Sequence, residues 1–192
     1  MAPRVRRRTA RQRELLDRLV DLMAAEGFSG FTLDDLAERL HCSKSTLYAL
    51  AGSKQELVVE VAKQFFRTSS LRVEDAVGGI EDPTDWIATY LQAVGECLKP
   101  MSPAFMEDLA AFPPADEVYR RNTAIAAGRI RDKVVEGMAG GAFRQVHAAL
   151  AAELVAVAMG EIQRGTLSER LGLTHAEAYA ELAGLVVHGL AE

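Results

Sequence analysis

The segment LDDLAERLHCSKSTLYALAGSK, residues 33–54, decides the fold class of this chain. It opens with apolar residues at helical spacing and continues into a second short helical pattern that starts at Ser43. Only His41 and Cys42 separate the two patterns, a turn too short for antiparallel packing, so the two helices are expected to cross steeply. The segment therefore predicts a helix-turn-helix whose second helix lies in the major groove of DNA.

A polar cluster occupies the N-terminal half of the second helix. Leu47 and Leu50 are expected to face the core. The cluster that faces outward consists of Ser43, Lys44, Ser45, Thr46 and Tyr48. Hydroxyl and ammonium groups bind phosphates and base edges, and Lys54 stands at the next helix N-terminus, another phosphate-binding position. An ordinary helical hairpin with a solvated polar face is the alternative interpretation.

Charge is distributed unevenly along the chain. The net charge is −5, yet residues 1–54 hold ten Lys and Arg against seven Asp and Glu, a net charge of +3. Residues 55–192 carry a net charge of −8. Six arginines, including Arg6, Arg7, Arg8 and Arg11, precede the first acidic residue. A basic head on an acidic body predicts contact with phosphate at one end, and a solubilising tail is the alternative.

Composition and the signals for helix starts and ends favour an all-α fold. The chain has 192 residues, 49% of them hydrophobic, which suits one domain or one domain with a small module. Capping boxes are expected where Thr32 precedes Asp35, Ser53 precedes Glu56 and Thr174 precedes Glu177. Nine helices are predicted, covering 9–26, 33–40, 44–51, 54–77, 84–98, 104–112, 115–138, 146–164 and 175–190. Residues 166–171 are expected to form a short turn, and Pro113-Pro114 to break the chain.

Residues Thr32 to Leu57 resemble the second to fourth helices of the TetR family (tetracycline repressor and AcrR-like proteins) of bacterial transcriptional regulators. The strong resemblance covers roughly residues 10–65, and Gly140 to Leu154 is similar to the start of the family's eighth helix. The sequence departs from the family at His41, where a turn glycine is usual, and at Ala51, where an aromatic residue is usual. Both departures bear on contact geometry, and neither bears on the fold.

The resemblance implies two domains and a dimer. Residues 1–54, with a basic arm at 1–9, would form a three-helix DNA-binding domain, and residues 55–192 a six-helix effector-binding and dimerisation domain. The function implied is a repressor that a small, largely apolar effector releases from a palindromic double-stranded DNA operator. The expected DNA-binding residues are Arg6, Arg7, Arg8, Arg11, Thr32, Ser43, Lys44, Ser45, Thr46, Tyr48 and Lys54.

The resemblance also places an effector pocket among the middle helices and a homodimer interface on the last two. The expected pocket residues are Trp86, Tyr90, Cys97, Met101, Phe105, Met106, Phe112 and Tyr119. The expected dimerisation residues are Ala152, Ala156, Leu182, Leu185 and Val186. In both sets, ordinary packing within the monomer is the alternative.

The sequence also bears on three rival functions. Cys42 or Cys97 could make the chain a redox-responsive regulator, and a constitutive DNA-binding repressor would need no ligand. An enzyme is not expected, because the four histidines lack metal-ligand spacing and no catalytic motif or cofactor fingerprint occurs. We expect neither cofactor nor metal. With two cysteines, no signal peptide and no apolar stretch of about 18 residues, the chain is expected in the cytoplasm and off the membrane.

Overall fold

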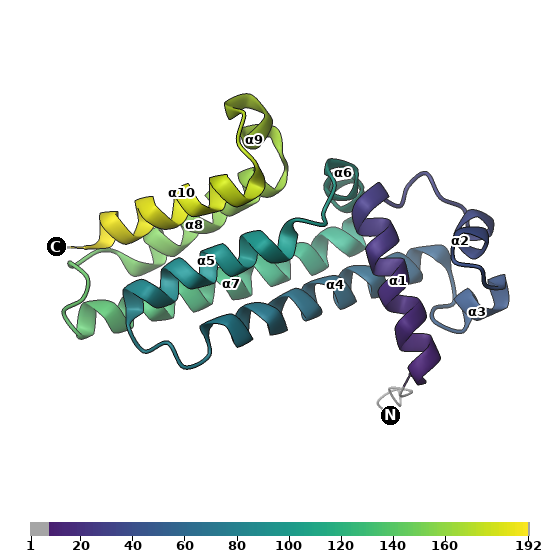
Figure 1. Cartoon of the computed structure of the whole chain (residues 1–192), viewed down its shortest axis with the longest axis horizontal. Helices are drawn as coiled ribbons and strands as arrows, with labels where there is room; N and C mark the ends of the chain where they lie inside the picture. The colour runs from purple at the N-terminus through teal and green to yellow at the C-terminus, as the bar shows by residue number, and fades with distance from the viewer. Residues whose placement is uncertain (1–7, 192) are drawn as a thin grey trace.

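The structure is a computed structural model that describes residues 8–191. Ten α-helices and no strand occur within that range (Figure 1). The helices are α1 (Ala10–Glu26), α2 (Leu33–Arg39), α3 (Lys44–Tyr48), α4 (Lys54–Val77), α5 (Pro83–Leu98), α6 (Pro103–Ala111), α7 (Pro113–Ala139), α8 (Ala148–Gln163), α9 (Thr166–Leu171) and α10 (His175–Leu190). The predicted all-α fold class is confirmed.

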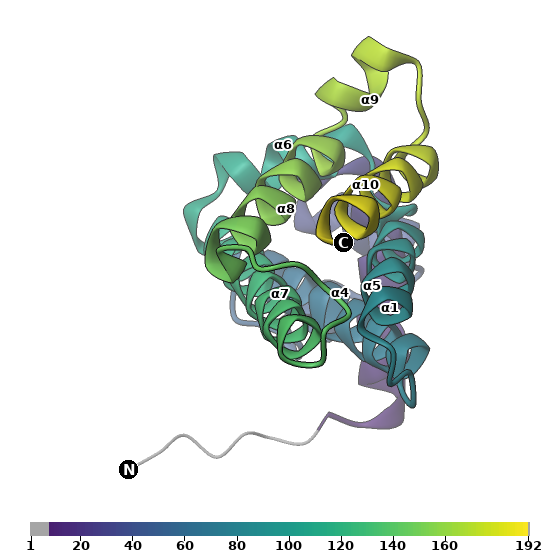
Figure 2. The ribbon, with the colours of Figure 1, turned by 90° about the vertical axis from the view of Figure 1, so that its left-hand side faces the viewer.

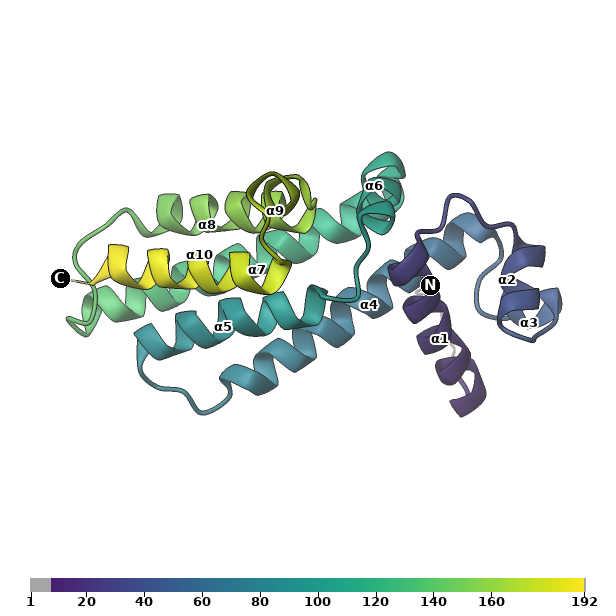
Figure 3. The ribbon, with the colours of Figure 1, turned by 45° about the horizontal axis from the view of Figure 1, so that its top comes forward.

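The helices are arranged as a small head and a long body. Helices α1, α2 and α3 form the head at one end, while α4, α5, α7, α8 and α10 lie alongside one another in the body (Figures 1 and 3). Helix α4 begins beside the head and runs into the body, where it packs against α5 and α7. The end-on view in Figure 2 shows α8 and α10 together on one side of the bundle. Helix α6 lies at the junction, against α1 and α7.

Local capping signals account for most of the helix starts. The Ser43 hydroxyl accepts a hydrogen bond from the Thr46 amide, as an N-cap should. The predicted capping boxes at Thr32 and Thr174 are confirmed. At Ser53 the box is incomplete, because the Glu56 carboxylate accepts from the Gly52 amide, not from Ser53. The start of α4 is nevertheless where the sequence predicts it.

Two predictions about the body need correction. Helix α7 begins at Pro113 itself, because proline is accepted in the first turn, where its missing N–H has no intrahelical partner. The expected break is therefore a single shared cap residue, Phe112. Residues 166–171 form the short helix α9 and not a turn, so the body from α4 to α10 has seven helices where six were predicted.

A continuous apolar core joins head and body. It includes Leu19 of α1, Leu47 of α3, Phe65 of α4, Leu91 of α5 and Ile130 of α7, each at most 5% exposed. Movement in the body can therefore reach the head through packed side chains. Within residues 8–191, none of the helices combines the length and the apolar character needed to cross a bilayer.

Candidate DNA-binding surface and effector cavity

The turn between α2 and α3 is held in a left-handed conformation. His41 has φ of 51°, a conformation that glycine adopts without cost and that histidine adopts more readily than most residues. The Cys42 amide then donates to the carbonyl of Ala37, 2.9 Å away, which closes the end of α2. Leu47, at 1% exposure, anchors α3 to the core. The departure from the family's glycine therefore keeps the backbone shape that the turn requires.

Helix α3 presents its polar side chains unequally. Lys44, Ser45 and Tyr48 are exposed, and Tyr48 keeps 51% of its surface in solvent. The ammonium of Lys44 lies 2.6 Å from a carboxylate oxygen of Asp34, which raises the lysine pKa. The Ser43 hydroxyl lies within 2.8 Å of the hydroxyls of Ser45 and Thr46 as well as capping the helix. Ser43 therefore organises the start of α3, and Lys44, Ser45 and Tyr48 are the side chains that this helix exposes to solvent.

The other expected phosphate ligands lie outside α3 and differ in their contacts. The Thr32 hydroxyl donates to Asp35 over 2.7 Å, and this hydrogen bond is the first cause of the lowered Asp35 pKa. Lys54 donates from Nζ to the Ser29 carbonyl over 3.2 Å. Arg8 forms an ion pair with Glu60 on α4, whereas Arg11 is exposed on the first turn of α1. The predicted contacts Arg6 and Arg7 lie outside the described residues.

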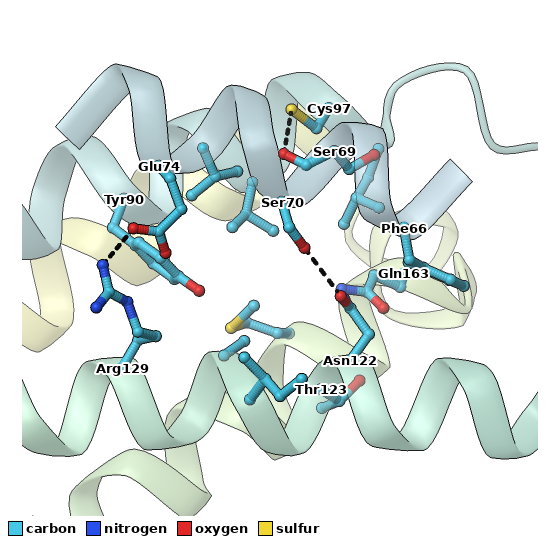
Figure 4. Close-up of a pocket in the computed structure, with 16 residues that line it drawn as sticks. Phe66, Ser69, Ser70, Glu74, Tyr90, Cys97, Asn122, Thr123, Arg129 and Gln163 are labelled. Carbon is cyan, nitrogen blue, oxygen red and sulfur yellow. Dashed lines mark hydrogen bonds and ion pairs between the residues drawn. The ribbon is translucent and has the colours of Figure 1, made fainter. Parts of the chain in front are cut away.

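A cavity lies in the body between α4, α5, α7 and α8 (Figure 4). The volume that the centre of a water molecule can reach inside it is about 60 Å³. Nine of its residues carry polar or sulfur-containing side chains other than methionine, so the lining is more polar than the sequence predicted. The lining residues are Phe66, Ser69, Ser70, Val73, Glu74, Tyr90, Val94, Cys97, Leu98, Asn122, Thr123, Ile125, Ala126, Arg129, Met159 and Gln163.

Polar contacts tie α4 to its neighbours around this cavity. Ser70 donates to the Asn122 side-chain oxygen over 3.1 Å, and Glu74 forms an ion pair with Arg129. The Cys97 thiol lies 3.7 Å from the Ser69 carbonyl. Burial, followed by the charge of Glu74, raises the pKa of Tyr90 to about 12, so its hydroxyl stays protonated at neutral pH. Occupation of the cavity would compete with these contacts of α4.

Gln163 is a buried polar residue of the cavity lining, at 8% exposure. Its side-chain nitrogen donates to the Tyr179 hydroxyl over 2.8 Å. Its side-chain oxygen is buried and has no hydrogen-bond partner among the residues that the structure describes. A buried polar atom without a partner costs free energy, so this oxygen marks a position where a bound molecule gains by supplying the missing hydrogen bond.

The predicted pocket residues divide into three groups. Tyr90 and Cys97 line the cavity. Phe112 and Tyr119 border shallower hollows elsewhere on the surface. Packed in the core without lining the cavity are Trp86, Met101, Phe105 and Met106. The sequence analysis missed the wall supplied by α4 and α7, although Phe66, Ser69, Ser70 and Val73 recur at helical spacing, a pattern that puts serines on a buried stripe.

The predicted dimerisation residues also occupy different environments. Ala152 and Ala156 are buried against the chain's own helices, at 2% and 8% exposure. Leu182 and Val186 are half-buried, while Leu185 is 72% exposed. An apolar row that was not predicted lies on the outer face of α8 and consists of Leu150, Leu154 and Val157, each at least 57% exposed.

Hydrogen bonds and ring packing join the residues after α1 in the head to α6 in the body. Asp108 of α6 accepts hydrogen bonds from the Phe28 amide and, over 2.8 Å, from the Ser29 amide. The Phe28 ring packs edge-on against Phe105 with the ring centroids 6.0 Å apart. Gly27 has φ of 78°, and a Cβ there would lie 2.7 Å from the Asp108 carboxylate. Only glycine lets the chain approach α6 this closely.

Comparison with known proteins agrees with this geometry. Residues 15–61 match the family model for bacterial regulatory proteins of the tetR family. Among curated protein sequences, no relative matches the chain.

Solved structures share the fold at low sequence identity. A TetR-family regulator from Agrobacterium tumefaciens is 14% identical over 95% of this chain and 98% of its own, with a TM-score of 0.76. A regulator from Saccharomonospora viridis, solved with choline, is 16% identical over 96% and 100%, with a TM-score of 0.81. The ketosteroid regulator KstR2 of Mycobacterium tuberculosis is 21% identical over 97% of both chains, with a TM-score of 0.62.

The family model covers the helix-turn-helix that carries the exposed α3 side chains, and the likeness to solved structures extends the fold over the body. On these grounds residues 15–61 carry a DNA-binding domain of the tetR family of bacterial regulatory proteins, and the chain as a whole has the fold of solved regulators of that family.

Proposed function

We propose that this regulator is a repressor that binds a near-palindromic operator as a homodimer and is released when a small effector occupies the cavity. In this proposal residues 1–54 are the DNA-binding domain and residues 55–192 bind effector and dimerise. One observation carries the proposal: α4 runs unbroken from Lys54, beside the DNA-binding helices, to Ser69, Ser70 and Glu74 in the cavity wall. The same rigid element thus belongs to both sites.

Release follows from competition for the contacts of α4. An effector seated beside Ser70–Asn122 and Glu74–Arg129 separates α4 from α7. Because α4 has 24 residues, it is about 36 Å long, and a small tilt at the cavity becomes a larger displacement at Lys54. Only an effector with different affinity for the two shapes can drive this change. The contacts of Asp108 with the α1 end supply a second route by which α6 moves the head.

The dimer interface is proposed on the outer faces of α8 and α10. Leu150, Leu154 and Val157 make one exposed apolar row, and Leu185 is exposed on the neighbouring helix α10. Exposed apolar groups gathered in this way mark a protein–protein interface. A two-fold pairing of these helices gives a dimer with two copies of α3. In this proposal the two copies enter successive major grooves, which lie about 34–36 Å apart on one face of DNA.

Small-molecule control has support from the structural neighbours. The Saccharomonospora regulator was solved with choline, and KstR2 is described as a ketosteroid regulator. Redox control has less support here, because burial raises the pKa of both Cys42 and Cys97 and so lowers the fraction of reactive thiolate.

Selection of bound fragments from the host genome tests the proposal. We expect a short site with two-fold symmetry, bound by the dimer, and increased transcription of the adjacent gene when the regulator is deleted. Decreased transcription on deletion would instead make the protein an activator. An asymmetric site bound by a monomer would contradict the dimer.

A further inference from the structure

The chemistry of the cavity restricts the kind of effector that it can hold. One of its buried polar groups is the Gln163 amide, whose nitrogen donates a hydrogen bond to the Tyr179 hydroxyl and whose oxygen has no partner among the described residues. A half-turn of this amide would exchange its two atoms, so the unpartnered one can be an acceptor or a donor. A hydroxyl or a primary amide can donate and accept, and therefore satisfies Gln163 in either orientation.

The charges in the lining cancel. Glu74 is the one Asp or Glu and Arg129 the one Lys or Arg among the described residues of the lining, and they form an ion pair with each other. A charged effector would therefore lose its hydration without an unpaired partner of opposite sign to replace it, which is costly. The other polar side chains, among them Ser70, Asn122 and Thr123, are uncharged.

The rest of the lining is apolar, and the cavity is small. Phe66 and Tyr90 contribute rings, and Val73, Leu98 and Met159 contribute aliphatic surface. Because the centre of a water molecule can reach only about 60 Å³ of the cavity, the cavity favours a small molecule. A flat, compact body with one polar group matches these walls.

We propose that the effector is a small uncharged molecule with an apolar body and a hydroxyl or primary amide that hydrogen-bonds to Gln163. This inference rests on the proposed function, since it names the chemistry of the molecule that would fill the same cavity. It changes the expected "largely apolar" effector into one with a required polar group.

A matched set of probes tests the chemical class. Benzyl alcohol and benzamide carry the proposed group, toluene lacks it, and benzoate and choline are charged. Binding is measured by titration calorimetry and by the side-chain amide NMR signals of Gln163, assigned from their absence in Gln163→Leu. We expect benzyl alcohol or benzamide to bind at least about tenfold more tightly than the other three and to shift those signals, as one buried hydrogen bond would require. Equal or tighter binding of toluene, benzoate or choline, or no binding by the two neutral polar probes, overturns the proposal.

Variants separate recognition from folding. Gln163→Leu alone leaves the Tyr179 hydroxyl unpaired and can destabilise the fold. The double variant Gln163→Leu/Tyr179→Phe removes both partners and should keep its thermal midpoint, yet lose about tenfold in affinity for the neutral polar probe. Tyr179→Phe alone retains the Gln163 amide and should bind within about threefold of the unaltered protein. Unchanged affinity in the folded double variant overturns the role of Gln163.

A separate measurement of operator release distinguishes failure of the release mechanism from failure of the proposed chemical class of effector. If a charged or apolar probe occupies the cavity and releases DNA, the repressor mechanism stands and the proposed chemical class is wrong. If benzyl alcohol shifts the Gln163 signals and leaves operator affinity unchanged, the chemical class stands and the release mechanism fails.

Discussion

The head and the body solve different recognition problems. The head uses helices of seven and five residues, held by caps and a few leucines, to present Lys44, Ser45 and Tyr48 to solvent. The body uses helices of up to 27 residues to bury a cavity containing the unpaired Gln163 oxygen. Exposed groups lose little when unoccupied, because water replaces the partner, whereas a buried group is penalised until a partner arrives. The head therefore recognises DNA through the positions of its exposed side chains. The body selects its effector through the cost of leaving a buried polar atom without a partner.

The largest effect is expected where the body sets the spacing of two heads. Leu154→Arg combined with Leu185→Arg places charges on the exposed apolar faces of α8 and α10. We expect a folded monomer whose operator affinity falls by on the order of a hundredfold or more, because the second half-site is lost. Light scattering and operator titration measure the two effects. Leu171→Arg, at another exposed leucine, is the matched control, and a dimer that survives the double substitution would refute the interface.

Loss of the core anchor of α3 should break the head and spare the body. Leu47→Ala removes a side chain that is 1% exposed, a change that costs about 2 to 5 kcal/mol in a packed core. We expect operator binding to vanish while probe binding in the cavity persists. Urea unfolding and hydrogen exchange at α3 would show the local loss. Leu171→Ala serves as the exposed control, and operator affinity within twofold of the original would show that α3 is seated by other contacts.

The junction between the two regions offers a finer comparison. Asp108→Ala removes the acceptor of the Phe28 and Ser29 amides and should cost about 1 to 3 kcal/mol of stability. We expect the variant to bind operator and probe but to couple them more weakly, so that a releasing effector shifts operator affinity less. Glu107→Ala, on an exposed neighbour in α6, is the control. Undiminished coupling would show that the Asp108 hydrogen bonds do not transmit the change from body to head.

The smallest effect is expected from a single exposed cation. Lys44→Ala removes a side chain at the start of α3 that is already paired with Asp34. If Lys44 neutralises one phosphate, the slope of log affinity against log salt concentration should fall by about 0.9. Operator titrations at several salt concentrations measure the slope, and Lys63→Ala on α4 is the control. An unchanged slope would remove Lys44 from the phosphate contacts.

Sequence reasoning worked best for the head because its determinants are local. Thr32 and Ser43 cap helices within three residues of their partners, and Leu47 shows its burial through helical spacing. The cavity is assembled from four helices, so its lining depends on how distant stripes meet. The choice of large apolar residues between 86 and 119 found Tyr90 and Cys97 but also selected Phe105 and Met106, which fill the core. Ser70, Asn122 and Gln163 come together only through tertiary packing.

The separation of head from body along the long direction of the molecule also has an electrical consequence. Residues 8–54 hold seven Lys and Arg and seven Asp and Glu, whereas residues 55–191 hold twelve and nineteen, so the net negative charge of the described residues lies in the body. The field of a nucleic acid therefore repels the body more than the head, which favours an end-on, head-first encounter. Sideways encounters are repelled, which shortens the search for a productive orientation at low ionic strength.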